Sequence, residues 1–116
     1  MTLNRLPDYI DQMLEAIHLA ASYIEGINKA DFVEDKRTQQ AVVLNLIVIG
    51  EIATKILRDY PGFSSQHAHI AWASMKGMRN RIAHSYYDIN LDTVWETIQT
   101  ALPALGSDLT AIKATL

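Results

Sequence analysis

The chain has 116 residues, of which 49% are hydrophobic and 20% are charged, and it contains no cysteine. This composition excludes a disordered chain and a disulfide-stabilised one, and the length suits a single domain over residues 1–116 around one core. The formal net charge of −3 argues against a protein that coats nucleic acids with a broad basic surface.

The N-terminal stretch MTLNRLPDYIDQM does not resemble a secretory signal, because it has an aspartate among its first ten residues and lacks an apolar core. No apolar run is expected to reach membrane-spanning length, and the absence of cysteine fits a reducing compartment. We therefore expect a soluble, cytoplasmic protein without a membrane partner.

Residues 5–27 are predicted to form an amphipathic helix, because apolar side chains recur at spacings of three and four. The positions expected to be buried are Leu6, Ile10, Met13, Leu14, Ile17, Ala20, Ala21 and Ile24. Gly26 and Asn28 are typical of a helix end, and Asp31 is expected to cap a short turn through FVED.

Residues 36–59 contain the apolar run VVLNLIVIG, which alone would fit a buried strand as well as a helix. The flanks favour a helix, because helix formers continue on both sides, Glu51 and Lys55 have the spacing of an i,i+4 ion pair, and Pro61-Gly62 provides a stop. A helix that is apolar nearly all round must be covered on more than one side. Three other helices are not expected to suffice, so we expect a partner chain.

A third helix is predicted to begin after Ser64 or Ser65 as its N-cap, to run through His84, and to end at the Tyr86-Tyr87-Asp88 stretch. Its expected buried residues are Ile70, Met75, Met78 and Ile82.

Asn90 is predicted to cap a fourth helix, which Pro103 should kink or divide. The side chains expected to face inward are Leu91, Val94, Trp95, Ile98, Leu102 and Leu105. Together, the four predicted helices indicate an all-α bundle.

The cationic residues cluster in one part of the chain. No acidic residue lies between Asp59 and Asp88, whereas the basic side chains of that segment are Lys76, Arg79, Arg81, His67, His69 and His84. Two of the arginines and a histidine lie in the stretch RNRIAHSYY, where a surface helix would normally alternate charge signs. An anionic ligand would therefore meet this segment, and phosphate is the ligand that suits arginine best.

Arg79 and His84 are five residues apart, so on an ideal helix their side chains diverge by about 140°, whereas Asn80 and His84 share a face. Either the helix ends near His84 and turns the imidazole back toward the arginine, or two copies of the segment meet across a two-fold axis. RNA cleavage without a metal needs a base, an acid and a cation beside the phosphate. A symmetric dimer would supply two imidazoles and two arginines, and an imidazole can accept or donate a proton near neutral pH.

Other polar residues give no comparable signal. His67 and His69 form H-x-H, which lacks the i,i+4 spacing of a helical metal pair, and we expect neither a metal site nor a cofactor. Glu51 is either a surface residue paired with Lys55 or an inward carboxylate that holds an arginine or backbone donors near the dimer axis.

Arg79, His84 and Tyr86 spell R-x-x-x-x-H-x-Y, and the surrounding IAWASMKGMRNRIAHSYYDINLDTVWETI resembles the motif helix and the following helix of HEPN-domain proteins, specifically the HepT-like toxins. The Gly50-Glu51 pair followed by IATKIL is also similar to that group. The resemblance extends over essentially the whole chain and implies an up-down bundle of four to five helices that forms a homodimer.

The resemblance further implies a metal-independent endoribonuclease toxin with both motifs at the dimer interface. Arg79 and His84 would be the catalytic pair, and Asn80 would orient the substrate or the histidine. A minimal nucleotidyltransferase antitoxin would silence the toxin by transferring AMP to Tyr86, and the two proteins could form a higher assembly. Lys76 and Arg81 are candidate contacts to RNA phosphates, although both also fit solvated cations on a helix face.

Two competing hypotheses follow from the same residues. In the first, the cationic cleft binds a nucleotide or substrate for a partner nucleotidyltransferase and performs no chemistry itself. In the second, the chain is a structural oligomerisation module, and Arg79 and His84 belong to a hydrogen-bond network at its interface.

Overall fold

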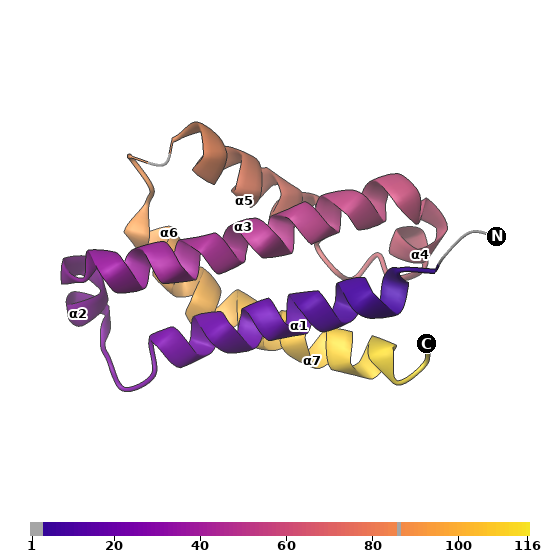
Figure 1. Ribbon diagram of the computed structural model, residues 1–116, viewed down its shortest axis with the longest axis horizontal. Helices are drawn as coiled ribbons and strands as arrows, with labels where there is room; N and C mark the ends of the chain where they lie inside the picture. Colours follow the sequence, from indigo (N-terminus) through magenta and orange to yellow (C-terminus); the bar gives the residue numbers. More distant parts are fainter. Residues whose placement is uncertain (1–3, 86) are drawn as a thin grey trace.

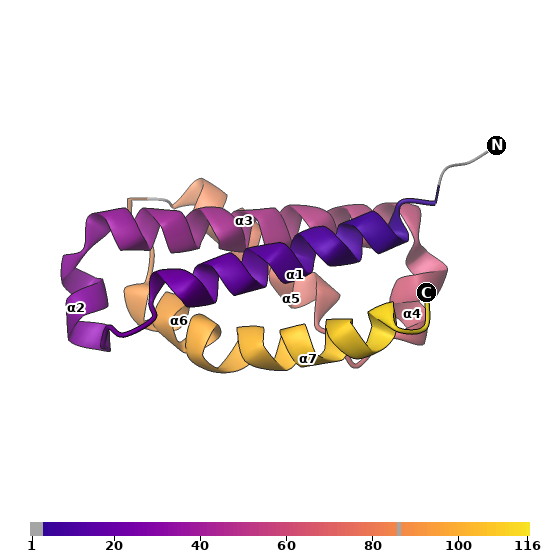
Figure 2. The same ribbon diagram turned by 60° about the horizontal axis from the view of Figure 1, so that its bottom comes forward.

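The computed structural model describes residues 4–85 and 87–116, and every regular element within these ranges is helical, which confirms the all-α prediction. The elements are α1 (Leu6–Tyr23), α2 (Lys29–Glu34), α3 (Lys36–Asp59), α4 (Pro61–Gln66), α5 (Trp72–His84), α6 (Leu91–Glu96), a π-helical segment (Thr97–Ala101) and α7 (Leu102–Lys113). The successive long helices α1, α3, α5 and α7 run up and down along the long axis of the molecule (Figures 1 and 2).

Helix α1 is shorter than predicted, and Ala16 rather than Ala21 is buried on its inner face. The helix ends at Tyr23, and Gly26 then takes a φ of 79°, a left-handed conformation that glycine adopts at little cost. Asn28 caps α2, where it forms a reciprocal capping box with Asp31. The prediction that Asp31 itself is the cap was therefore wrong by one turn, because its carboxylate is better placed to accept a hydrogen bond from the backbone N–H of the cap residue.

Helix α3 spans the predicted residues, and the strand alternative for VVLNLIVIG is excluded. Asp35 caps it by accepting hydrogen bonds from the backbone N–H and the hydroxyl of Thr38, of which the hydroxyl is the larger cause that lowers the pKa of this carboxyl. Contrary to expectation, α3 is long and apolar enough to cross a membrane by length and composition alone. A buried core helix passes the same test, and α3 is the central helix between α1 and α5 (Figures 1 and 2).

The predicted third helix begins later than expected, because residues 67–71 are not helical and α5 starts at Trp72; the short helix α4 before them was not predicted. Pro61 follows the end of α3 and is also the first residue of α4. At this position its missing N–H costs nothing. The predicted serine caps were wrong: Ser64 is buried within α4, and its hydroxyl donates to the carbonyl of Pro61. The break after α4 is fixed by Trp72, whose indole N–H donates to the carbonyl of His67.

Asn90 caps α6 as predicted by accepting a hydrogen bond from the backbone N–H of Thr93. The predicted fourth helix continues through the π-helical segment into α7. Pro103 lies directly after this wider turn, which accommodates a residue that has no N–H to donate. The ring of Trp95 packs against the buried ring of Phe32 at a centroid distance of 5.3 Å, so α6 is anchored to α2.

Candidate functional site

The site is built where α5 crosses α3, and Gly50 makes this crossing unusually close. A Cβ atom placed on Gly50 would lie 2.3 Å from the Cβ of Arg79 and 2.8 Å from the carbonyl oxygen of Met75. Both distances are shorter than atoms of these types tolerate, so only glycine fits at this position. The Gly50-Glu51 pair of the sequence therefore brings the backbones of α3 and α5 together beside Arg79.

Two neighbours hold the guanidinium of Arg79. Its Nη2 forms an ion pair with Oε1 of Glu51 on α3, and its Nη1 donates to Oδ1 of Asn80 at 2.6 Å. The Nε atom is buried and has no hydrogen-bond partner among the described residues. An arginine in this position is therefore fixed by its terminal nitrogens, while its Nε carries the cost of an unsatisfied donor.

The pairing of Glu51 resolves the alternatives that the sequence left open. Its carboxylate binds Arg79, whereas the ammonium of Lys55 lies 5.9 Å from the ring centroid of Tyr9. Of the two alternatives, the structure therefore has the carboxylate that holds an arginine, because Arg79 faces Glu51 from the neighbouring helix.

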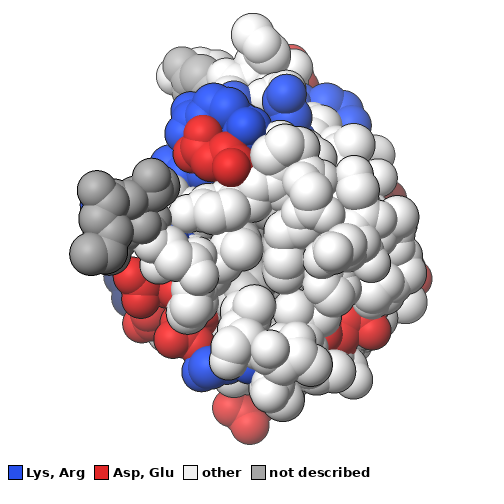
Figure 3. Space-filling model, turned by 90° about the vertical axis from the view of Figure 1, so that its right-hand side faces the viewer, with Lys and Arg blue, Asp and Glu red and all other residues white. Residues whose placement is uncertain are grey.

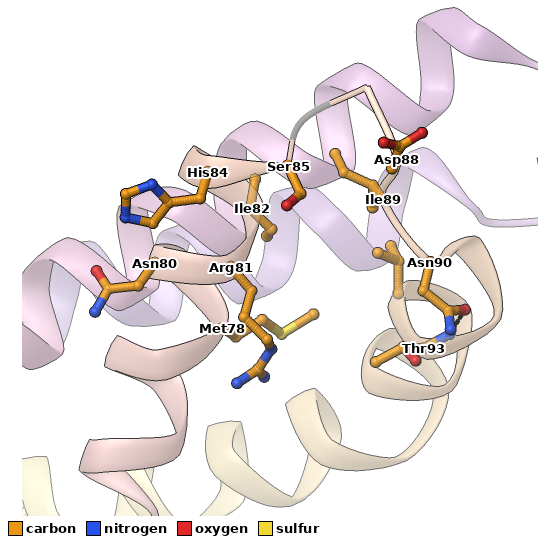
Figure 4. A pocket seen from close by; sticks show the side chains of 11 residues that line it. Met78, Asn80, Arg81, Ile82, His84, Ser85, Asp88, Ile89, Asn90 and Thr93 are labelled. Atoms are coloured by element: carbon orange, nitrogen blue, oxygen red, sulfur yellow. Dashed lines mark hydrogen bonds between the residues drawn. The ribbon is translucent and has the colours of Figure 1, made fainter.

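His84 is the last residue of α5, with Ser85 as the C-cap, and its side chain is exposed. Its imidazole extends to the same side of α5 as the Asn80 amide, as their i,i+4 spacing predicts (Figure 4). Among the residues that the structure describes, no hydrogen bond joins Arg79 to His84. Asn80 lies between the two predicted catalytic residues in sequence, and its side chain accepts a hydrogen bond from Arg79.

A cavity of about 590 Å³ opens between the end of α5 and the start of α6. Its polar lining includes Asn80, Arg81, His84 and Thr93. Figure 4 shows the side chains of Met78 and Arg81 extending away from His84 toward the lower part of this space. Arg81 also lines a second cavity of about 380 Å³ between α5 and the π-helical segment. Arg81 therefore borders both cavities.

The remaining candidates are less enclosed. Lys76 is exposed on α5, and Tyr86, the predicted modification site, lies outside the described residues. The rings of His67 and His69 are 6.0 Å apart, and the described residues contain no cluster of three or more histidine or acidic side chains that could hold a metal ion.

On the face that Figure 3 shows, charge is distributed locally rather than as one broad field. Figure 3 shows the end of the molecule that carries α4, where most of the surface is uncharged and basic atoms lie next to acidic ones. Arg58 and Asp59 form one such pair at the end of α3, at 2.8 Å. The arginines of α5 stay the main candidates for binding an anion on the charge pattern of the sequence alone.

Comparison with known proteins places the chain in a family. The chain is similar to a protein of Thermococcus cleftensis named "Probable ribonuclease HepT", with 35% identity over 98 residues that cover 84% of this chain and 86% of that protein. A protein of Caldanaerobacter subterraneus subsp. tengcongensis named "Putative RNase TTE0752" is 29% identical over 90% of each chain. No solved structure shows significant similarity to the chain.

A further relative is about twice as long as the region that this chain matches. "Gamma-glutamylcyclotransferase and putative RNase MJ0434" of Methanocaldococcus jannaschii is 27% identical over 93% of this chain but only 47% of its own length. The family model described as "Ribonuclease HepT-like" matches residues 13–112, which include the crossing of α3 and α5 and the whole of the candidate site. The chain therefore belongs to the ribonuclease HepT-like family of the HEPN superfamily.

Proposed function

We propose that the protein is a metal-independent endoribonuclease that acts as a cytoplasmic toxin. The observation that carries this proposal is the α5 site itself, in a chain of the ribonuclease HepT-like family: a guanidinium fixed on Glu51 and Asn80, with an exposed imidazole at the end of the same helix. Guanidinium and imidazole are the two groups that RNA cleavage without a metal requires.

In the proposed reaction, a neutral imidazole of His84 takes the proton from the 2′-hydroxyl, and the 2′-oxygen attacks the adjacent phosphorus. The bond from phosphorus to the 5′-oxygen breaks, and a protonated imidazole supplies a proton to this leaving oxygen. Arg79 stabilises the negative charge that develops on the phosphoryl oxygens. Asn80 helps to orient Arg79, and Lys76 and Arg81 bind neighbouring phosphates.

This mechanism needs two imidazoles, and each chain supplies one at this site, so we propose a homodimer in which both α5 motifs face one cleft. An uncovered apolar surface supports dimerisation: Leu44 of α3 is 60% exposed, and beside it Val43, Ile47, Ile89 and Leu91 line a hollow of about 450 Å³. Exposed apolar surface of this kind is typical of an interface between chains.

The proposed control is transfer of AMP to Tyr86 by a minimal nucleotidyltransferase antitoxin. Tyr86 follows His84 by two residues in the sequence. A bulky phosphodiester there would bring negative charge close to the cations of α5 and would compete with the RNA phosphate.

The test is cleavage of a defined RNA, with and without EDTA, by the unmodified protein and by His84→Ala. This substitution removes both imidazoles of the proposed shared cleft and should lower kcat by at least about 100-fold, because general acid–base catalysis contributes roughly 10²- to 10⁴-fold. Intact-mass analysis of each sample, including protein co-expressed with a candidate nucleotidyltransferase, shows whether the chain carries AMP, and peptide mapping shows whether Tyr86 holds it. Equal cleavage by the mutant would overturn the nuclease proposal and would favour the binding-subunit hypothesis if nucleotide transfer persisted.

A mixing experiment tests the shared cleft. Wild type and His84→Ala are combined in varied ratios, unfolded and refolded together so that subunits exchange. If each cleft needs both imidazoles, activity should fall with the square of the wild-type fraction. A linear fall would show that each chain acts alone and would contradict the shared cleft.

A further inference from the structure

Glu51 is the residue at the α5 site to which the proposed reaction assigns no role. It belongs to α3, a helix that otherwise forms the centre of the core, and it is far from the motif in sequence. Its side chain is 45% exposed, and its carboxylate pairs with Arg79 of α5, whereas the Lys55 ammonium lies 5.9 Å from the ring centroid of Tyr9. An isolated surface ion pair contributes about 0–1 kcal/mol to stability, so this contact alone gives little reason for an acidic residue here.

The position of this ion pair suggests that it orients the guanidinium and does not mainly stabilise the fold. Gly50 brings α3 against the Cβ of Arg79. The Arg79 side chain therefore leaves the crossing of the two helices beside Glu51, which binds its guanidinium. A guanidinium has five N–H donors. Nε is buried, Glu51 accepts from Nη2, and Asn80 accepts from Nη1. One N–H on each terminal nitrogen therefore remains for a phosphate, which matches the two-pronged geometry that phosphate prefers.

We infer that Glu51 is a positioning residue that holds the Arg79 guanidinium ready for the scissile phosphate. The inference rests on the proposed ribonuclease function. A free arginine side chain samples many rotamers, and ordering it costs free energy at each turnover, whereas an arginine held by Glu51 and Asn80 is already ordered. The carboxylate also lowers the local positive charge, so Glu51 favours orientation at the expense of attraction for RNA.

The test compares Glu51→Ala and Glu51→Gln with wild type and with Glu15→Ala, which removes an exposed carboxylate from α1. Glu51→Ala should lower kcat by roughly 10- to 100-fold, the usual loss when a supporting group is removed, with KM unchanged or lower. Glu51→Gln keeps an acceptor for Arg79 and should recover part of that loss. Glu15→Ala should cleave like wild type.

A second readout does not depend on activity. In protein labelled with ¹⁵N-arginine, the Nε–H signal of Arg79 is assigned by its loss in Arg79→Lys. This buried proton should exchange slowly with water in wild type and in Glu51→Gln, and at least about tenfold faster in Glu51→Ala, because buried groups exchange only through local opening.

The outcomes separate the inference from the proposed function. If wild type cleaves RNA, His84→Ala does not, and Glu51→Ala matches Glu15→Ala in kcat, the positioning role is overturned while the ribonuclease stands. If His84→Ala cleaves as well as wild type, the proposed function fails, and the catalytic meaning of Glu51 fails with it. Unchanged exchange of the Arg79 signal in Glu51→Ala would overturn the inference whatever the activity.

Discussion

Helices α1 and α5 both pack on α3, but they do so in different ways. Seven residues of α1 are buried, whereas α5 buries only Trp72 and Ile82. Helix α1 also contacts α7, while the main neighbour of α5 is α3. The difference teaches that the two helices serve different purposes: α1 builds the core, and α5 is attached to it at one close crossing and carries the polar residues of the candidate site.

The comparison predicts that the same substitution costs more on α1 than on α5. Met13 of α1 is fully buried, so Met13→Ala should lower the free energy of unfolding by about 2–5 kcal/mol. Met78 of α5 is half-buried and lines both cavities, so Met78→Ala should cost roughly 1 kcal/mol or less. Urea unfolding of both variants, followed by circular dichroism, measures the two values.

Repeating these melts at several protein concentrations provides the control. If Met78→Ala lowered the free energy of unfolding as much as Met13→Ala does, the proposed difference between α1 and α5 within one chain would be contradicted. If that cost grew with protein concentration, a second copy would be covering α5, because the stability of an oligomer depends on concentration.

A pair of glycines sharpens the comparison. Replacement by alanine should change the free energy of unfolding in opposite directions at the contact of α3 with α5 and at the contact of α7 with α1. Gly50→Ala pushes a methyl group against the backbone of α5 and should lower the free energy of unfolding by about 1–3 kcal/mol. Gly106 is within α7, and its added Cβ would make an ordinary 3.6 Å contact with Ile17. Gly106→Ala should therefore raise stability by roughly 0.5–1 kcal/mol, since alanine is the better helix former.

The glycine pair also links stability to the site. Because Gly50→Ala displaces α5 at Arg79, it should reduce RNA cleavage as well, whereas Gly106→Ala should leave cleavage unchanged. Thermal melts and the cleavage assay on the same samples test this. A neutral Gly50→Ala would mean that α3 and α5 do not approach in solution as closely as described.

Sequence reasoning predicted the parts of the fold that local signals determine. The bounds of α3 and the cap at Asn90 were confirmed, because apolar periodicity and a capping side chain act over a few residues. The break between α4 and α5 was missed, because HAHIA contains no glycine or proline. That break depends on Trp72, whose indole reaches back to the carbonyl of His67, and such a contact has no periodic signature.

The candidate site was predictable only within α5. The motif named Arg79, Asn80 and His84, but the partner of Arg79 lies on another helix. Glu51 was left with two alternatives because a sequence does not reveal which helices cross. The available signal was Gly50, a glycine inside an otherwise apolar helix, which often marks a close approach of another backbone.

Arg79→Met should give the smallest change in stability, and it distinguishes a catalytic role of Arg79 from a structural one. Arg79→Met keeps much of the apolar stem but removes the ion pair with Glu51, the hydrogen bond to Asn80 and also the buried, unsatisfied Nε. The lost ion pair is partly exposed and is worth about 0–1 kcal/mol and the lost hydrogen bond about 1.5–3 kcal/mol, while relief of an unsatisfied donor returns about 1–3 kcal/mol. These contributions nearly cancel, so the free energy of unfolding should change little, whereas RNA cleavage should be lost. Arg58→Met, which removes the exposed pair with Asp59, is the matched control and should change neither property. A large loss of stability in Arg79→Met with normal cleavage would instead identify Arg79 as part of an oligomerisation scaffold. Removal of a residue that serves only packing lowers stability and leaves catalysis unchanged.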